Sequence, residues 1–438
     1  MLAKDLKDAV GQEVCVQGWV QKIRDQKAIV FLILRDHTGV VQVVFDRNKQ
    51  VESRITGALA SLTTESAVTV FGRVVANPVV KLGGIEIDLD DIRIESIAET
   101  PPPLDPFARV QARLENRLDW RFLDLRRPEN YLVFRVQTII EAAMRRFWLS
   151  QGFLEMHSPK LMGSASESGA ELFTLQHFGQ QAYLAQSPQF YKQMAMCAGF
   201  DKVFEVGPVF RANPSFTSRH DTEFTSVDVE ISWIDSHDDV MKFEESWLNY
   251  VIQAVKDEAG DAIKAAFDRD VVVPAVPFPR IPMAEARARL SALGYEPPAE
   301  GKGDLDPQGE RMLGDLVQKE YGHEFVFVTD YPISVRPFYH MRYADDPGTT
   351  KSFDLIWKGI EITTGAQREH RYEILRNQAI EKGITPESIQ FYLDFFRFGA
   401  PPHGGFGFGL TRMLMIMMGF ANVREVTFLY RGPNRLTP

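Results

Sequence analysis

The sequence 203-VFEVGPVFR-211, followed by a polar loop to His220 and then by 223-EFTSVDVE-230, decides the fold class of the larger part of this chain. Both runs are rich in β-branched and aromatic residues, and the polar stretch between them predicts an antiparallel hairpin. Arg211 ends the first strand, and Asp228 lies inside the second. Because a charge inside a strand is costly unless it is paired, these residues indicate either an ion pair within the sheet or a binding site.

A second polar segment, residues 352–368, predicts two strands that turn near Lys358-Gly359. Asp354 and Glu361 lie one on each strand. Two carboxylates so placed can share a hard cation with phosphate oxygens. Carboxylates on edge strands are also common, so the spacing by itself leaves both interpretations open.

Two further segments combine backbone signals with charge. Residues 401–412 hold four glycines, which let a backbone approach a ligand, and the helix that follows would carry Arg412 in its first turn. The Gly-Lys-Ser/Thr ending of a Walker loop is absent. Residues 183–193 predict a strand and then a helix with Gln189 and Lys192 on one face. Tight helix–sheet packing and a solvated lysine are the plainer interpretations.

The N-terminal part has a different pattern. Residues 13–97 contain short strands with turn signals and one helical stretch at 52–62, which predicts a small closed β-barrel. An OB-fold is the natural candidate, and another small barrel is the alternative. The prolines at 101–103 mark a break. We therefore expect a barrel at 1–100, a linker at 101–128, and a larger domain at 129–438 with helices at 133–147, 240–267 and 306–321.

Composition narrows the class of protein. The 438 residues are 45% hydrophobic and 25% charged, as in ordinary globular proteins, with a net charge of −10. A nucleic-acid partner would therefore have to meet a local basic surface. Two distant cysteines exclude a disulfide scaffold or a cysteine metal site, and they fit a reducing cytosol. We expect no signal peptide and no membrane span, since apolar runs fall short of the roughly 20 residues needed.

Taken together, these segments resemble a known family. The stretches 152-GFLEMHSP-159, Phe210-Arg211 with the loop to Phe224, and 407-GFGLTR-412 resemble the three signature motifs of class II aminoacyl-tRNA synthetases. Within that class, 186-QSPQFYKQ-193, 365-GAQREHR-371 and 435-RLTP-438 resemble the aspartyl enzymes in their compact archaeal/eukaryotic form. The resemblance covers essentially the whole chain. It implies an α+β protein, with an anticodon-binding OB-fold barrel and a catalytic domain whose antiparallel sheet is flanked by helices.

The resemblance also implies a reaction. L-aspartate would be activated with ATP and Mg²⁺ to aspartyl-adenylate and then transferred to tRNA(Asp), with tRNA(Asn) an open second acceptor. The enzyme would be a cytoplasmic homodimer, with Arg211 and Arg412 as its catalytic residues. The expected ATP-binding residues are Arg211, Ala212, Asn213, Arg219, His220, Asp221, Phe224, Glu361, Gly409, Leu410, Thr411 and Arg412. Asp354, Glu361 and Thr364 would hold the metal.

The amino acid would be bound by a second set of residues. These are Glu167, Gln189, Lys192, Arg211, Asp228, Thr364 and Arg368. Arg368 suits the side-chain carboxylate, because a guanidinium binds a carboxylate through two parallel hydrogen bonds. In the barrel, Phe31, Gln42 and Lys81 match anticodon-reading positions; aromatic stacking on splayed bases suits such a surface. Phe31 could equally belong to the barrel core.

Several positions depart from the family pattern. Asn213 and Thr411 stand where acids are usual, and Ala366 and Ser168 stand where glycine is usual. Together these departures allow a divergent paralogue. Separately, three alternatives stay open: an asparaginyl enzyme, a paralogue that makes asparagine from aspartyl-adenylate, and a tRNA-binding protein without catalysis. Gln21 and Lys81 reveal no clear preference between tRNA(Asp) and tRNA(Asn).

Overall fold

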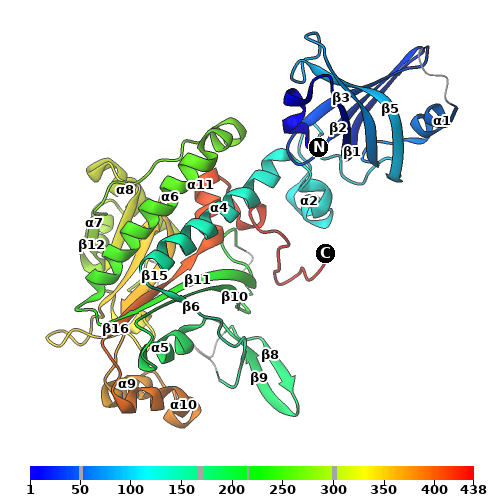
Figure 1. Cartoon of the computed structure of the whole chain (residues 1–438). Coiled ribbons are helices and arrows are strands. Elements are labelled where there is room, and N and C mark those ends of the chain that lie inside the picture. Colours follow the sequence, from blue (N-terminus) through cyan, green and yellow to red (C-terminus); the bar gives the residue numbers. More distant parts are fainter. Residues whose placement is uncertain (49–52, 165–170, 215–216, 298–302) are drawn as a thin grey trace. The chain divides into compact units, whose positions relative to one another are not determined.

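The computed structural model describes residues 1–48, 53–164, 171–214, 217–297 and 303–438 (Figure 1). The chain separates into two compact units, Met1–Tyr131 and Leu132–Pro438. Each unit has its own hydrophobic core.

The N-terminal unit is built on a closed barrel, as predicted. Over the described residues the strand order is β1-β2-β3-β5-β4. All neighbours pair antiparallel except β3 and β5, which are parallel. The elements are η1 (Ala3–Ala9), β1 (Glu13–Gln26), β2 (Ile29–Arg35), β3 (Val40–Asp46), α1 (Ser53–Ser61), β4 (Ala67–Ala76), β5 (Ile85–Ser96), α2 (Leu114–Asp119) and α3 (Arg121–Asp124). The strands alternate in burial, so every second side chain enters the barrel core.

The C-terminal unit is built on one large sheet with strand order β12-β13-β14-β15-β16-β11-β10-β6 within the described part of the chain. Its strands are β6 (Leu154–Glu155), β10 (Lys202–Phe210), β11 (Glu223–Ser232), β12 (Arg280–Pro282), β13 (Phe325–Thr329), β14 (Ser352–Trp357), β15 (Ile360–Gln367) and β16 (His403–Gly409). The central pairs are antiparallel, as expected, whereas β6–β10 and β12–β13 at the two edges are parallel. The hairpin predicted at 203–230 is β10 and β11.

Helices surround the sheet. They are α4 (Pro128–Ser150), α5 (Gln189–Cys197), α6 (His237–Phe267), α7 (Met283–Ala292), α8 (Pro307–Tyr321), α9 (Tyr372–Glu381), α10 (Gln390–Leu393) and α11 (Leu410–Met418). The expected helices at 133–147, 240–267 and 306–321 correspond to α4, α6 and α8. The remaining elements are β7 (Leu161–Met162), β8 (Thr174–His177), β9 (Gln180–Leu184), η2 (Ile333–Val335), η3 (Pro386–Ile389), η4 (Asp394–Phe398) and η5 (Val423–Glu425).

Helices α4, α6 and α11 cover one face of the sheet and leave the opposite face for a site. The ring centres of Trp148 in α4 and Trp247 in α6 lie 5.2 Å apart, and both rings pack with Phe406 of β16 in the same core. Val227 and Val229 of β11 point into this core. Because strand side chains alternate, Asp228 and Glu230 point to the opposite face.

Candidate active site

A pocket of ≈ 350 Å³ lies on this opposite face of the sheet. It collects residues from α5, β11, β15, β16 and the loop between β10 and β11. The expected site residues that line it are Gln189, Lys192, Arg211, Asn213, Arg219, His220, Asp221, Phe224, Asp228, Glu361, Thr364, Arg368, Gly409, Thr411 and Arg412. Segments more than 200 residues apart in the sequence thus form one pocket.

The remaining expected residues lie elsewhere. Leu410 points into the core under the sheet, and the backbone N–H of Ala212 donates to the carbonyl of Glu171 at 2.8 Å. Asp354 is buried beside the pocket. Glu167 and Ser168 lie outside the described residues.

The pocket also contains residues that the sequence did not single out. They are Glu171, Ser187, Ser226, Arg336, Pro337, Tyr339, His340, Ile362, Gly407 and Phe408. Ser226 could have been found, because it lies two residues before Asp228 and so shares its face of β11. Residues 336–340 follow the short helix η2 and carry no periodic signal.

Arg368 is held rigidly at one end of the pocket although it is almost fully buried. Its Nε donates to Oε1 of Glu230 at 2.9 Å, and its Nη2 donates to the carbonyl of Gly405 at 2.9 Å. Its Nη1 donates to Nε2 of His340 at 3.1 Å, which requires a neutral imidazole. Burial does lower the pKa of His340 well below its ordinary value. These contacts fix the plane of the guanidinium.

Glu230 is the buried counter-ion of this end of the pocket. Burial by itself would raise its pKa, but the charges of Arg368 and Lys192 outweigh burial and hold the pKa below its ordinary value. The Nζ of Lys192 lies 3.4 Å from Oε2 of Glu230. The carboxylate therefore stays ionised between two cations.

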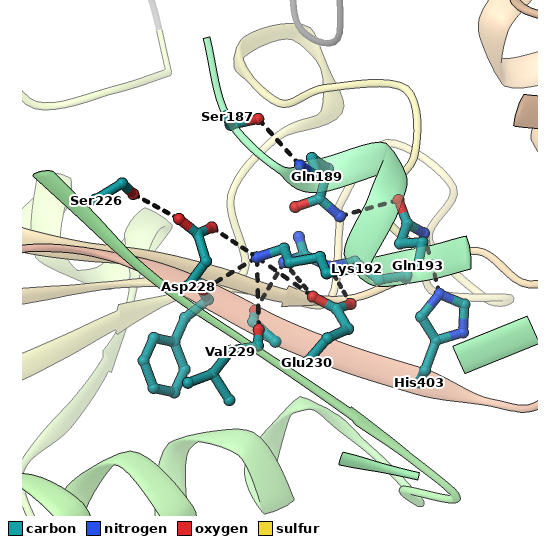
Figure 2. A network of polar contacts seen from close by, with 12 residues as sticks. Ser187, Gln189, Lys192, Gln193, Ser226, Asp228, Val229, Glu230 and His403 are labelled. Carbon is teal, nitrogen blue, oxygen red and sulfur yellow. Dashed lines mark hydrogen bonds and ion pairs between the residues drawn. The ribbon is translucent and has the colours of Figure 1, made fainter. Parts of the chain in front are cut away.

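Figure 2 shows a chain of hydrogen bonds that orients the amide of Gln189. Nδ1 of His403 donates to the carbonyl of Pro401 at 2.8 Å, so its Nε2 must accept from Nε2 of Gln193 at 3.0 Å. Oε1 of Gln193 then accepts from Nε2 of Gln189 at 2.9 Å. As a result, the carbonyl oxygen of Gln189 is left as an acceptor for a ligand.

Positive charge gathers at the other end of the pocket. The guanidinium of Arg211 lies 5.5 Å from the ring centre of Phe224, and Nη1 of Arg412 donates to the carbonyl of Glu361 at 2.8 Å. Burial first, and then three neighbouring guanidiniums, lower the pKa of His220 to about 4. These guanidiniums belong to Arg412, Arg211 and Arg219. Such convergence of cations suits a polyphosphate.

The barrel unit holds a separate hollow of ≈ 760 Å³. Phe31, Gln42 and Lys81 all line it. Phe31 is part-buried and lies under the guanidinium of Arg24, 5.4 Å from its ring centre. The aromatic ring therefore faces a surface hollow and does not belong to the core cluster of the barrel. This geometry favours the stacking interpretation over the core interpretation.

Comparison with known proteins now decides the family. Residues 113–431 match the family of class II tRNA synthetases (D, K and N), and residues 14–95 match the OB-fold nucleic acid binding domain. The chain belongs to the class II tRNA synthetases. Its barrel is accordingly an OB-fold, and the large sheet is the synthetase domain.

Relatives of this synthetase span its whole length. The aspartate–tRNA(Asp) ligase of Pyrococcus abyssi is 44% identical over 98% of this chain and 97% of its own, and the aspartate–tRNA(Asp/Asn) ligase of Methanopyrus kandleri is 43% identical over 98% and 96%. Among solved structures, the asparaginyl-tRNA synthetase of Pyrococcus horikoshii complexed with asparaginyl-adenylate has a TM-score of 0.91 at 32% identity, covering 100% of this chain and 99% of that one. The aspartyl-tRNA synthetase of Entamoeba histolytica has a TM-score of 0.88 at 32% identity, covering 100% and 92%.

The residues of this synthetase fit a magnesium ion. Thr364 Oγ1 lies 3.2 Å from Oε1 of Glu361 in the pocket, and Asp354 lies directly opposite Thr364 on the neighbouring strand. Oδ2 of Asp354 accepts from Arg336 at 2.7 Å, while its buried Oδ1 has no hydrogen-bond partner among the described residues. Mg²⁺ typically takes one or two carboxylates together with phosphate oxygens. The described residues contain no cluster of three acidic, histidine or cysteine side chains suited to a metal.

The residues that depart from the family pattern lie in different parts of the synthetase domain. Asn213 and Thr411 line the pocket, so they can alter its contacts. Ala366 is buried in β15 between Ser352 and Gly405 of the neighbouring strands, away from the pocket lining. None of the described helices has the length and apolar character needed to cross a bilayer.

Proposed function

We propose that the protein is an aspartate–tRNA ligase. It activates L-aspartate with ATP to aspartyl-adenylate, releases pyrophosphate, and transfers the aspartyl group to the 3′ end of tRNA(Asp). The observation that carries this proposal is the rigid guanidinium of Arg368 at the end of a pocket whose opposite end gathers three arginines. The names of the full-length relatives support the same activity.

Recognition of aspartate follows from the fixed donors. Arg368 presents a guanidinium edge to the side-chain carboxylate, and Lys192 adds positive charge behind it. The amide nitrogen of asparagine would face N–H donors and leave them unpaired, which is costly in a buried site. The α-ammonium group needs acceptors, and the carbonyl oxygen of Gln189 and the carboxylate of Asp228 are available, together with Glu167 by resemblance.

Activation needs positioning and charge neutralisation more than proton transfer. The α-carboxylate of aspartate is already a nucleophile, so the protein has to hold it in line with the α-phosphate. Arg211 neutralises that phosphate while its guanidinium covers Phe224, whose ring supports the adenine. Arg412 contacts the phosphates from the opposite side. Glu361, Thr364 and Asp354 would hold a magnesium ion, which would supply further neutralisation of the phosphate charge.

In this proposal, the OB-fold binds the anticodon of the tRNA. Phe31 stacks on an anticodon base, and Gln42 and Lys81 provide polar contacts in the same hollow. Residues 1–100 form the anticodon domain, 101–128 the linker and 129–438 the catalytic domain. We further propose a cytoplasmic homodimer through 152-GFLEMHSP-159, and we leave tRNA(Asn) as a second acceptor to experiment.

The deciding experiment is ATP–pyrophosphate exchange with purified protein, with aspartate and asparagine supplied separately. We expect exchange with aspartate, followed by aspartylation of purified tRNA(Asp); tRNA(Asn) is assayed in parallel. Exchange driven by asparagine alone would replace the proposal with an asparaginyl enzyme. Free asparagine formed without tRNA would indicate the asparagine-forming paralogue. Absence of exchange with both amino acids would indicate a tRNA-binding protein.

A further inference from the structure

Helix α8 is docked against the sheet by close backbone contact. A Cβ atom on Gly314 of α8 would lie 2.6 Å from the backbone nitrogen of Gly359, at the turn between β14 and β15. A Cβ atom on Gly359 would lie 2.7 Å from Cα of Arg311, and Gly359 also has a φ of +74°. Only glycine fits this contact without displacement. The first turns of α8 are therefore fixed relative to β15, which carries Glu361.

From this fixed helix, the side chain of Glu310 contacts the loop between β10 and β11. Its Oε2 accepts from Nη1 of Arg219 at 2.6 Å and lies 3.5 Å from the backbone nitrogen of Glu361. The Arg219 and Glu310 side chains are 16% and 12% exposed. Arg219 lines the pocket, whereas Glu310 is not among the lining residues and lies behind Arg219 and the backbone of Glu361.

The position of the Glu310 carboxylate is electrostatically unfavourable apart from its ion pair with Arg219. Burial first, and then the charge of the nearby Glu361 carboxylate, raise the pKa of Glu310 to about 7, although the charge of Arg219 opposes this shift. An additional negative charge at this place would also repel a polyphosphate. Arg219, however, lies in a segment where residues 211–214 and 217–222 form no helix or strand, so its long side chain would lose much rotational freedom on binding a ligand. An ion pair to the rigid helix α8 orders the Arg219 side chain before the ligand binds, so less conformational entropy is lost on binding.

We propose that Glu310 is a positioning residue that holds the guanidinium of Arg219 at the phosphate end of the pocket and thereby strengthens ATP binding. The ion pair occupies one Nη1 hydrogen of Arg219, and a guanidinium has five N–H donors, so others can meet phosphate oxygens. This inference rests on the proposed function and deepens it. It assigns to α8 a role in binding ATP.

A double-mutant cycle on the full chain tests the inference. The variants are Glu310→Ala, Glu310→Gln, Arg219→Ala and the double alanine variant, with Glu320→Ala as the control. Glu320 lies on the same helix in an exposed ion pair with Arg289. Two readouts are measured: the Kd of Mg·ATP by titration calorimetry, which needs no amino acid, and the KM values of ATP and aspartate in the exchange reaction.

We expect Glu310→Ala to raise the Kd and KM of ATP about fivefold, with the KM of aspartate unchanged. Glu310→Gln should weaken ATP binding less than Glu310→Ala does, because the amide oxygen of glutamine still accepts a hydrogen bond from Arg219. In the Arg219→Ala background, Glu310→Ala should add nothing. An equal loss in both backgrounds, a lower Kd for ATP, or a parallel loss for aspartate would overturn the inference. ATP binding without aspartate-driven exchange would instead count against the proposed function.

Discussion

Nζ of Lys192 lies 3.0 Å from Oδ1 of Asp228, and both side chains are almost completely buried. The same ammonium donates to the carbonyl of Phe406 at 3.0 Å and lies 3.4 Å from Glu230. Its three hydrogens are therefore engaged by protein oxygens at the lining of the pocket, and Figure 2 shows the contacts to Asp228 and Glu230. Lys192 balances the two carboxylates that face it and contributes to aspartate binding mainly through its charge.

Replacing Lys192 should destabilise the protein as well as inactivate it. Lys192→Met leaves two buried carboxylates with one cation fewer, and breaking a buried pair costs about 3–5 kcal/mol. Chemical denaturation measures the free energy of unfolding. Lys264→Met is the control, because Lys264 forms an exposed pair with Asp268, worth about 0–1 kcal/mol. Equal stability losses in the two variants would refute the structural role of Lys192.

Arg368→Lys should sharply reduce the activation of aspartate. A single ammonium cannot keep the contacts to Glu230, His340 and the substrate at once. We expect kcat/KM for aspartate in the exchange reaction to fall by at least about 100-fold, equivalent to roughly 2.7 kcal/mol. Arg371→Lys is the matched control, since Arg371 is half-exposed and pairs with Glu369. Full activity of Arg368→Lys would show that the carboxylate is recognised elsewhere.

The buried imidazole of His403 should make stability depend on pH. Burial lowers its pKa from the ordinary 6.5 to about 4. As the pH falls below 6.5, His403 binds a proton in the unfolded chain but stays neutral in the folded protein. The stability that His403 contributes is therefore fully present above pH 6.5 and decreases as the pH falls toward 4. The loss attributable to His403 is on the order of 3 kcal/mol.

The His403→Gln variant isolates this contribution, because glutamine offers a donor and an acceptor but does not titrate. The free energy of unfolding is measured for both proteins between pH 4 and pH 8. We expect the wild type to lose more stability than the variant across the acid range. Parallel pH profiles would mean that His403 does not control this behaviour.

Phe31→Ala should separate the two half-reactions. Stacking of one base on an aromatic ring is worth about 1–3 kcal/mol, so kcat/KM for tRNA aspartylation should fall about 5- to 150-fold. Amino-acid activation takes place in the other unit, and ATP–pyrophosphate exchange should not change. Val79→Ala is the control, because Val79 is exposed and lines the same hollow. A substitution of Phe45 would not serve, because Phe45 belongs to the barrel core. Unchanged tRNA charging would contradict the stacking role.

Much of the architecture could be predicted from local patterns. Runs rich in β-branched and aromatic residues, separated by turn or loop signals, identified the barrel strands and the 203–230 hairpin, and the helices α4, α6 and α8 were also expected. The motif residues Arg211, Arg368 and Arg412 do meet in one pocket. The parallel edge strands β6 and β12 could not be predicted, since two or three residues carry too little periodicity.

The partners of the site residues were decided only by tertiary structure. Glu230 and Arg368 are 138 residues apart, and Arg219 and Glu310 are 91 residues apart. Their meeting depends on the strand order, because β11 and β15 both pair with β16, and on the glycine contact that docks α8. Sequence alone determined which residues carry charge and which elements hold them. Long-range packing decided which charges are buried together, because burial and pairing depend on neighbours that no local pattern encodes.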